Sequence, residues 1–204
     1  MRSGKRNEGR AAFLAVKSAD PNFTDADLML VEMDIQDGNN GSARQILNAV
    51  LKSKPWRADA LAKLAEVETR SENRRAAVQK YRDLVNVDPQ NIMALNNLAS
   101  LLSLEEPNEA LKFAQRALEL SPDDPNVQDT LGWVCYGRSM YPLAIKHLKA
   151  AVDKAPTPRH QFHLAMAYTK SGEQKLGQEM LDRALKADPN VQKSEGRLDA
   201  DAKR

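Results

Sequence analysis

The chain has little of what catalytic and metal sites need. Its 204 residues include one cysteine and three histidines, and they contain no Ser/His/Asp arrangement, no Gly-rich phosphate loop and no Cys/His cluster. A single cysteine allows neither an internal disulfide bond nor a multi-cysteine metal site. We therefore expect no enzymatic activity, no cofactor and no metal ion.

Two further absences limit the kinds of partner that the chain can be expected to bind. The chain has 30 Lys and Arg residues against 28 Asp and Glu residues, and nucleic-acid binders usually carry a clustered basic surface. No apolar run approaches the roughly 18 residues that cross a membrane, and residues 1–20 lack the apolar core of a signal peptide. We expect a protein or peptide partner, no nucleic acid, and no membrane span in this chain.

Proline recurs at a spacing of 33 or 34 residues. The recurring prolines are Pro21, Pro55, Pro89, Pro122, Pro156 and Pro189. Between them, the same kinds of residue return in phase: a Leu, a small residue directly after it, and later a small, a bulky and a small residue. Residues 123–156 supply the clearest set, which is Leu131, Gly132, Ala144, Leu148, Ala151 and Pro156.

This pattern resembles the tetratricopeptide repeat (TPR), a helix–turn–helix unit of 34 residues. The resemblance covers nearly the whole chain. It implies an all-α fold, a right-handed TPR superhelical solenoid of antiparallel helix pairs. It says little about function, because one fold can carry many functions.

The proline phase divides residues 5–189 into a single solenoid. We predict a half repeat at 5–21, full repeats at 22–55, 56–89, 90–122, 123–156 and 157–189, and a polar tail or short cap at 190–204. The expected helices are 5–18, 24–37, 41–52, 57–70, 74–86, 91–103, 107–119, 125–137, 141–154, 158–171 and 174–187. The turn at Ser71-Glu72-Asn73 lacks the usual glycine, whereas Gly137 can end a helix.

The chain begins in the second half of a repeat, with Gly9, Phe13 and Val16 in phase. An open solenoid end exposes core residues. We therefore interpret the chain as a piece excised from a longer protein, and the alternative is a native N-terminal cap. An uncovered apolar face also predicts self-association through the open N-terminal end.

First helices of TPR repeats generally line a concave groove that binds peptides or partner segments. The candidate binding residues are those that should face it: Glu32, Glu66, Asn96, Asn97, Asp129, Trp133, Tyr136, Arg159, Phe162, His163 and Met166. Amide side chains suit an extended peptide backbone, and Trp, Tyr and Arg most often dominate binding energy. In the alternative, Trp133 and Phe162 only fill the interface between adjacent repeats.

The histidine and cysteine residues are interpreted as ordinary structural or surface residues. His160 and His163 lie three residues apart, but two imidazoles make a poor zinc site, so we interpret them as surface histidines. Cys135 takes the place of a bulky packing residue, and we predict a buried, inert thiol.

The phrases ALNNLASLL (94–102) and DDPNVQDTLGWVCY (123–136) resemble the closing repeats of bacterial TPR proteins associated with exosortase and exopolysaccharide export. That resemblance implies a bacterial source and a periplasmic or envelope location, with the cytoplasm as the alternative. We predict a non-catalytic scaffold that binds a peptide or partner segment in the groove. The alternative is a TPR portion that presents a substrate or partner within a larger enzyme or polysaccharide-export machine.

Overall fold

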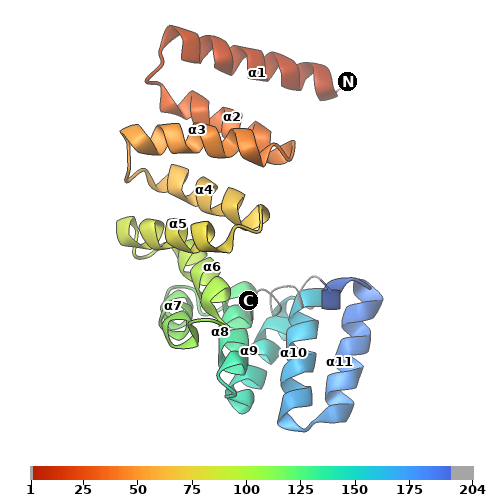
Figure 1. The fold of residues 1–204 in the computed structure, drawn as a ribbon. Coiled ribbons are helices and arrows are strands. Elements are labelled where there is room, and N and C mark those ends of the chain that lie inside the picture. Colours follow the sequence, from red (N-terminus) through yellow and green to blue (C-terminus); the bar gives the residue numbers. More distant parts are fainter. Residues whose placement is uncertain (1, 194–204) are drawn as a thin grey trace. The chain divides into compact units, whose positions relative to one another are not determined.

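A computed structural model describes residues 2–193, and all regular structure in that range is helical (Figure 1). The helices are α1 (Arg2–Ala19), α2 (Thr24–Gln36), α3 (Asn40–Ser53), α4 (Ala58–Arg70), α5 (Arg74–Val87), α6 (Ile92–Leu102), α7 (Pro107–Leu120), α8 (Pro125–Gly137), α9 (Tyr141–Lys154), α10 (Pro158–Ser171) and α11 (Gln174–Ala187). From α2 onward, every predicted boundary lies within one residue of the observed one. The predicted fold class, an all-α solenoid of antiparallel helix pairs, is confirmed.

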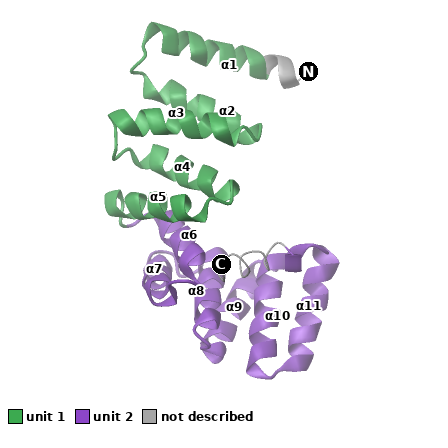
Figure 2. Cartoon of the chain, in the orientation of Figure 1, with its two compact units in different colours: residues 1–89 green, residues 90–204 purple. Residues whose placement is uncertain are grey.

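The chain forms two compact units, which are coloured separately in Figure 2. Unit 1 comprises residues 1–89 and contains α1, the pair α2/α3 and the pair α4/α5. Unit 2 comprises residues 90–204 and contains the pairs α6/α7, α8/α9 and α10/α11. Within each unit, the helices of a pair pack against one another, and consecutive pairs stack.

One core cluster of unit 1 is a strip of aliphatic side chains. It consists of Leu28, Val31, Ile35, Ala43, Leu47, Val50, Ala60, Leu64 and Val67. Along each helix these residues recur three or four positions apart, so they form one face. Isolated helices of this length are marginal in water, and burial of this face holds them in place.

Ion pairs join neighbouring helices across unit 1. Arg10 Nη2 lies 2.5 Å from Asp34 Oδ1 between α1 and α2, and Arg44 Nε lies 2.6 Å from Glu68 Oε1 between α3 and α4. In both pairs the carboxylate is almost fully buried while the guanidinium remains partly exposed.

In unit 2, two glycines lie where paired helices approach closely. A Cβ atom on Gly132 of α8 would lie 2.6 Å from Leu148 Cγ of α9, and one on Gly177 of α11 would lie 2.4 Å from Thr169 Oγ1 of α10. Both distances are shorter than a real Cβ contact. The two glycines therefore set how closely their helix pairs can pack.

Within residues 2–193, four turn residues adopt a left-handed backbone. Gly38 and Gly172 do so without a side-chain penalty,. Glu72, with φ of 57°, takes the place of the glycine that its turn lacks, and Ser139 has φ of 59°. Gly137 ends α8 as predicted, but the left-handed residue of that turn is Ser139.

The end of the described range packs onto α10 and α11. Val191 is buried in a cluster with Phe162 and Ala184. The remainder of the predicted tail or cap, residues 194–204, lies outside the described residues.

Candidate functional site

A hollow of about 490 Å³ opens on the first helices of the repeats in unit 2. It lies between α6, α8 and α10 and the turn before α8. Its lining is mostly polar and consists of Ile92, Met93, Asn96, Asn97, Ser121, Asp124, Asn126, Val127, Asp129, Thr130 and Arg159. Four predicted site residues therefore meet here: Asn96, Asn97, Asp129 and Arg159.

On the α6 side, the hollow is lined by amide side chains. Asn96 and Asn97 are both partly buried, and Asn97 Nδ2 lies 3.2 Å from Met93 Sδ. Asn96 Oδ1 is a buried oxygen that accepts no hydrogen bond from any residue that the structure describes. Such an oxygen is costly to leave unsatisfied, so Asn96 is a candidate acceptor for a hydrogen bond from a ligand.

Arg159 of α10 reaches across the hollow. Its Nη2 lies 3.5 Å from Ser100 Oγ on α6, and its Nε lies 3.4 Å from Asp129 Oδ2 on α8. The Arg159 side chain is 43% exposed, whereas the Asp129 side chain is 2% exposed. The guanidinium therefore spans the three first helices and still faces solvent.

His163 lies beneath this surface, and the interpretation of His160 and His163 as surface histidines was wrong. Both are buried, with exposed fractions of 3% and 0%. His160 Nδ1 lies 2.7 Å from the backbone oxygen of Ala155. His163 Nδ1 lies 2.9 and 3.0 Å from the two carboxylate oxygens of Asp129. Hydrogen bonds to α8 and to the turn before α10 make burial tolerable for both rings.

The Asp129 carboxylate is held in its charged form. Burial raises its pKa, but the charge of His163, the hydrogen bond from His163 and the charge of Arg159 together outweigh burial. Its pKa therefore lies below the usual range for an aspartate,.

The aromatic residues are packed more deeply than a binding surface requires. Trp133 is 5% exposed and lies between two rings, with centroids 4.6 Å from Tyr136 and 4.0 Å from His163. Phe162 is buried against Ala184 and Val191, with Met166 beside it. This packing favours the alternative for Trp133 and Phe162, in which they fill the interface between repeats. Tyr136 and Met166 remain partly exposed.

The two predicted carboxylates of unit 1 are already paired with cations. Lys63 Nζ lies 2.5 Å from Glu32 Oε2, and Arg70 Nη2 lies 2.7 Å from Glu66 Oε1. The hydrogen bond from Lys63, together with a second one from Gln36, holds the pKa of Glu32 below its usual range. These pairs reduce the negative charge available to a ligand.

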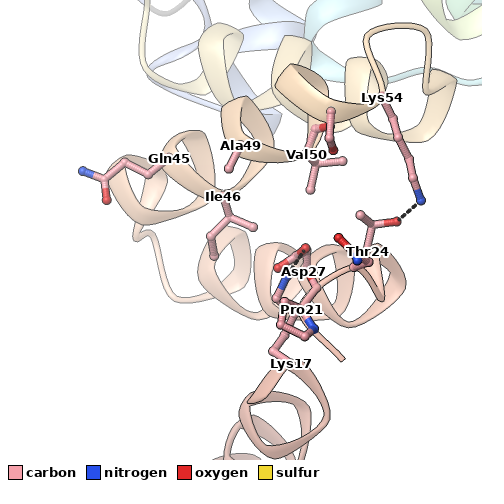
Figure 3. Close-up of a pocket in the computed structure, with 11 residues that line it drawn as sticks. Lys17, Pro21, Thr24, Asp27, Gln45, Ile46, Ala49, Val50 and Lys54 are labelled. Carbon is pink, nitrogen blue, oxygen red and sulfur yellow. Dashed lines mark hydrogen bonds and ion pairs between the residues drawn. The ribbon is translucent and has the colours of Figure 1, made fainter. Parts of the chain in front are cut away.

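A second hollow, of about 560 Å³, lies in unit 1 between α1, α2 and α3 (Figure 3). Lys17 Nζ lies 2.7 Å from Asp27 Oδ2 and 2.9 Å from the backbone oxygen of Pro21. Lys54 Nζ donates to Thr24 Oγ1 at 3.0 Å. Both ammonium groups therefore already have hydrogen-bond partners among the residues that line the hollow. The hollow of unit 2 is therefore the stronger candidate, although it is the smaller one.

The predicted uncovered face of α1 is present. Leu14 is 52% exposed and Val16 is 40% exposed. Self-association through this face stays a prediction, which sedimentation of a Leu14→Asp variant tests. The exposed apolar area of the α1 face should drive association of the wild type at high concentration.

Other candidate chemistry is sparse among the described residues. Cys135 is buried, as predicted, and burial raises the pKa of its thiol. No three His, Cys, Asp or Glu side chains of the described range gather in a way that could hold a metal ion. Within residues 2–193, no helix combines the length and apolar character needed to cross a membrane.

Sequence reasoning missed some of the lining. Thr130, Ser121 and Asp124 line the hollow, and none was a candidate. Asp124 had a readable signal, because it precedes Pro125 and caps α8 through the backbone N–H of Asn126,. Nothing in the periodic pattern distinguishes Thr130 from an ordinary polar residue.

Two segments match family profiles. Residues 62–125 and 161–191 both match the tetratricopeptide repeat. These two segments are tetratricopeptide repeats. The two matches fall on helix pairs of the observed fold, and the slots identified from the sequence are the packing positions of those pairs.

Known proteins share the fold at low sequence identity. A TPR repeat-containing protein of Pseudomonas aeruginosa is 26% identical over 168 residues, which cover 80% of this chain and 28% of that protein. The chain thus spans about a quarter of the length of this curated relative. A structure of MamA from Desulfovibrio magneticus that begins at its residue 41 has a TM-score of 0.70 at 16% identity, covering 84% of this chain and 96% of the MamA chain in that structure. YrrB, described as a TPR protein with an unusual peptide-binding site, has a TM-score of 0.70 at 19% identity, covering 88% and 93%.

Proposed function

We propose that the first-helix face of unit 2 binds an extended segment of a partner protein and that the chain acts as a non-catalytic scaffold. The observation that carries this proposal is the buried Asn96 Oδ1, which accepts no hydrogen bond within the described residues and belongs to a residue that lines a polar hollow. A peptide backbone presents N–H donors at regular intervals, so it can satisfy such an acceptor without a special sequence.

The rest of the hollow fits the same kind of ligand. Asn97 and Asn126 add amide donors and acceptors,, and Met93, which is 45% exposed, offers an apolar contact that adapts to different side chains,. The volume lies within the range of ligand sites in proteins. YrrB, which shares the fold, is described as having a peptide-binding site, and this description supports a peptide as the class of ligand.

Peptide display on the intact protein tests the proposal. A peptide selected on the wild type should bind an Asn96→Ala variant about tenfold more weakly, because one buried hydrogen bond contributes roughly 1.4 kcal/mol. Asn108→Ala is the matched control, since Asn108 is exposed on α7 and does not line the hollow. Circular dichroism establishes that both variants fold. Equal affinity for folded Asn96→Ala and Asn108→Ala would place the binding surface elsewhere.

A second candidate function is supported by the length of the curated relative, of which this chain covers 28%. Here the repeats present a substrate or partner within a larger enzyme or polysaccharide-export machine. The coding sequence on both sides of residues 1–204 distinguishes the candidates. A catalytic domain in the same reading frame favours the second candidate, and a signal peptide with a lipoprotein cleavage site favours an envelope scaffold.

A further inference from the structure

The hollow of unit 1 contains two lysines, and only one of them is paired with a carboxylate (Figure 3). Lys17 Nζ lies 2.7 Å from Asp27 Oδ2. Lys54 Nζ instead donates to the neutral hydroxyl of Thr24 at 3.0 Å, and no carboxylate of residues 2–193 pairs with it. The charged side chains of the lining are these two lysines and Asp27. They therefore leave the positive charge of Lys54 without a balancing anion in the hollow.

The Thr24 hydroxyl beside Lys54 has a proton to donate. Thr24 is the first residue of α2 and is 7% exposed. Its Oγ1 accepts hydrogen bonds from Lys54 Nζ and from Arg57 Nη1, which occupy both lone pairs of a hydroxyl oxygen. Among the residues that the structure describes, none accepts the hydroxyl proton. The Thr24 hydroxyl and the Lys54 ammonium are therefore neighbouring candidate donors for an oxygen of a ligand.

Arg57 does not share this role, because carboxylates already hold it. Its guanidinium pairs with Asp25, and its Nε lies 2.8 Å from Asp59 Oδ1. None of these three residues lines the hollow. Lys54 is therefore the cation through which the hollow can attract an anion.

The α3 side of the hollow is apolar. It is lined by Ile46, Ala49 and Val50, which lie opposite the start of α2 (Figure 3). Trp56, on the turn that follows Lys54, is 69% exposed. The volume of about 560 Å³ lies within the range of ligand sites in proteins. A ligand that fits this lining has an oxygen acceptor at one end and an apolar group beside it.

We propose that the hollow of unit 1 is a second peptide site, which binds an aspartate or glutamate side chain of a partner segment together with a neighbouring aliphatic side chain. The carboxylate accepts hydrogen bonds from Lys54 Nζ and Thr24 Oγ1, and the aliphatic group packs on the α3 side. A carboxylate suits these donors because it is an anion whose oxygens only accept, and because hydrogen bonds to an ionised group are the stronger kind. This site does not rest on the function proposed for the hollow of unit 2.

Peptide display on the intact protein tests this proposal, when peptides that also bind a Lys54→Met variant are removed. Lys52→Met is the matched control, because Lys52 is exposed near the end of α3, carries the same charge and does not line the hollow. The remaining peptides should contain an acidic residue beside an aliphatic one, and they should bind Lys52→Met as tightly as wild type. Replacing the peptide's acidic side chain by its amide should weaken binding about tenfold, as the loss of a hydrogen bond to a charged group predicts. Peptides without an acidic residue, or no peptides at all, would overturn the proposal.

A carboxylate placed within the hollow provides an independent variant. Ala49 is an exposed residue of the lining, so Ala49→Glu should block the acidic peptides and lower their affinity at least about tenfold,. Asn48→Glu adds the same charge at an exposed neighbour outside the lining and should leave the affinity nearly unchanged. Circular dichroism establishes that both variants fold. Equal losses in the two variants would mean that general charge repulsion, and not the hollow, governs binding.

The two proposed peptide sites can fail separately. If every peptide that binds wild type depends on Asn96 and none on Lys54, this inference is wrong and the proposed function stands. If peptides depend on Lys54 and none on Asn96, the proposed function is wrong and this inference stands. Sedimentation tests a second copy of the chain as the occupant. Self-association that is lost in Lys54→Met and kept in Lys52→Met, with no acidic peptide recovered, would assign the hollow to that copy and overturn the proposal.

Discussion

Unit 1 and unit 2 contain the same repeat but hold their helices together by different means. In unit 1, side chains such as Arg10, Arg44 and Lys63 pair with carboxylates on the neighbouring helix. In unit 2, glycines permit close approach, and a buried His–Asp pair lies under a stack of rings. Charged contacts at a surface contribute little to stability, whereas close packing and buried pairs contribute more. Both units bury a carboxylate almost completely, Asp34 in unit 1 and Asp129 in unit 2, but only in unit 2 is the partner side chain, His163, buried as well.

The largest expected effect on stability comes from a core leucine position that both units share. Leu47 in unit 1 and Leu148 in unit 2 occupy the same slot, and both are fully buried. Leu47→Ala and Leu148→Ala should each lower the free energy of unfolding by about 2–5 kcal/mol, through lost transfer energy and a residual cavity. Chemical denaturation measures the loss, and hydrogen exchange locates it. Costs that differ by more than about 2 kcal/mol would show that the two cores are not equivalent.

Gly132 tests the close packing of unit 2. An added Cβ would lie 2.6 Å from Leu148 Cγ and 3.0 Å from the Leu148 backbone nitrogen. Gly132→Ala should therefore destabilise the protein by about 1–3 kcal/mol despite the better helix propensity of alanine. Gly41→Ala, in a helix of unit 1 with nothing within 4 Å of the new Cβ, is the matched control and should stabilise by up to about 1 kcal/mol. Thermal unfolding of both variants decides between strain and propensity.

Asp34 tests the ion pairs of unit 1. Its buried carboxylate accepts from Arg10 and from Ser42 Oγ, both at 2.5 Å. Asp34→Asn should cost about 1–2 kcal/mol, because it removes charge-assisted hydrogen bonds from a buried group. Glu66→Gln breaks only an exposed pair with Arg70 and should change stability by less than about 0.5 kcal/mol. Similar costs for the two variants would remove the distinction between buried and exposed pairs.

The smallest expected effect is the stability that the exposed ion pairs of unit 1 lose at acidic pH. Hydrogen bonds from Lys63 and Arg57 hold the pKa values of Glu32 and Asp59 below their usual ranges. A lowered folded-state pKa contributes stability that is present above about pH 4 and is lost as pH falls through the lowered value. Both carboxylates are half exposed, so the effect on the thermal midpoint should be small.

Lys63→Gln should reduce this acid sensitivity, since the pKa of Glu32 then returns toward its usual value. Thermal midpoints of wild type and Lys63→Gln between about pH 5 and pH 3 provide the measurement. Parallel curves would mean that the Lys63–Glu32 pair contributes nothing to folding.

The repeat phase in the sequence was sufficient to predict the fold. Prolines 33 or 34 residues apart placed the turns, and the in-phase Leu and Ala slots identified the buried faces. These predictions succeeded because each repeat contacts only its neighbours. Local periodicity therefore contains nearly all the information that sets helix boundaries and core positions.

Tertiary structure decided the chemistry of the site. The sequence predicted that Asn96, Asn97, Asp129 and Arg159 share a face, and the structure brings them to one hollow. It could not show that His163 is fully buried against Asp129 or that Trp133 is covered by two rings. A first helix in a solenoid contacts its own partner and the next repeat, so burial at its edges depends on side chains about 30 residues away. A periodic pattern identifies the face of a helix, but only the packed neighbours determine whether a polar side chain on that face contacts solvent or another charge.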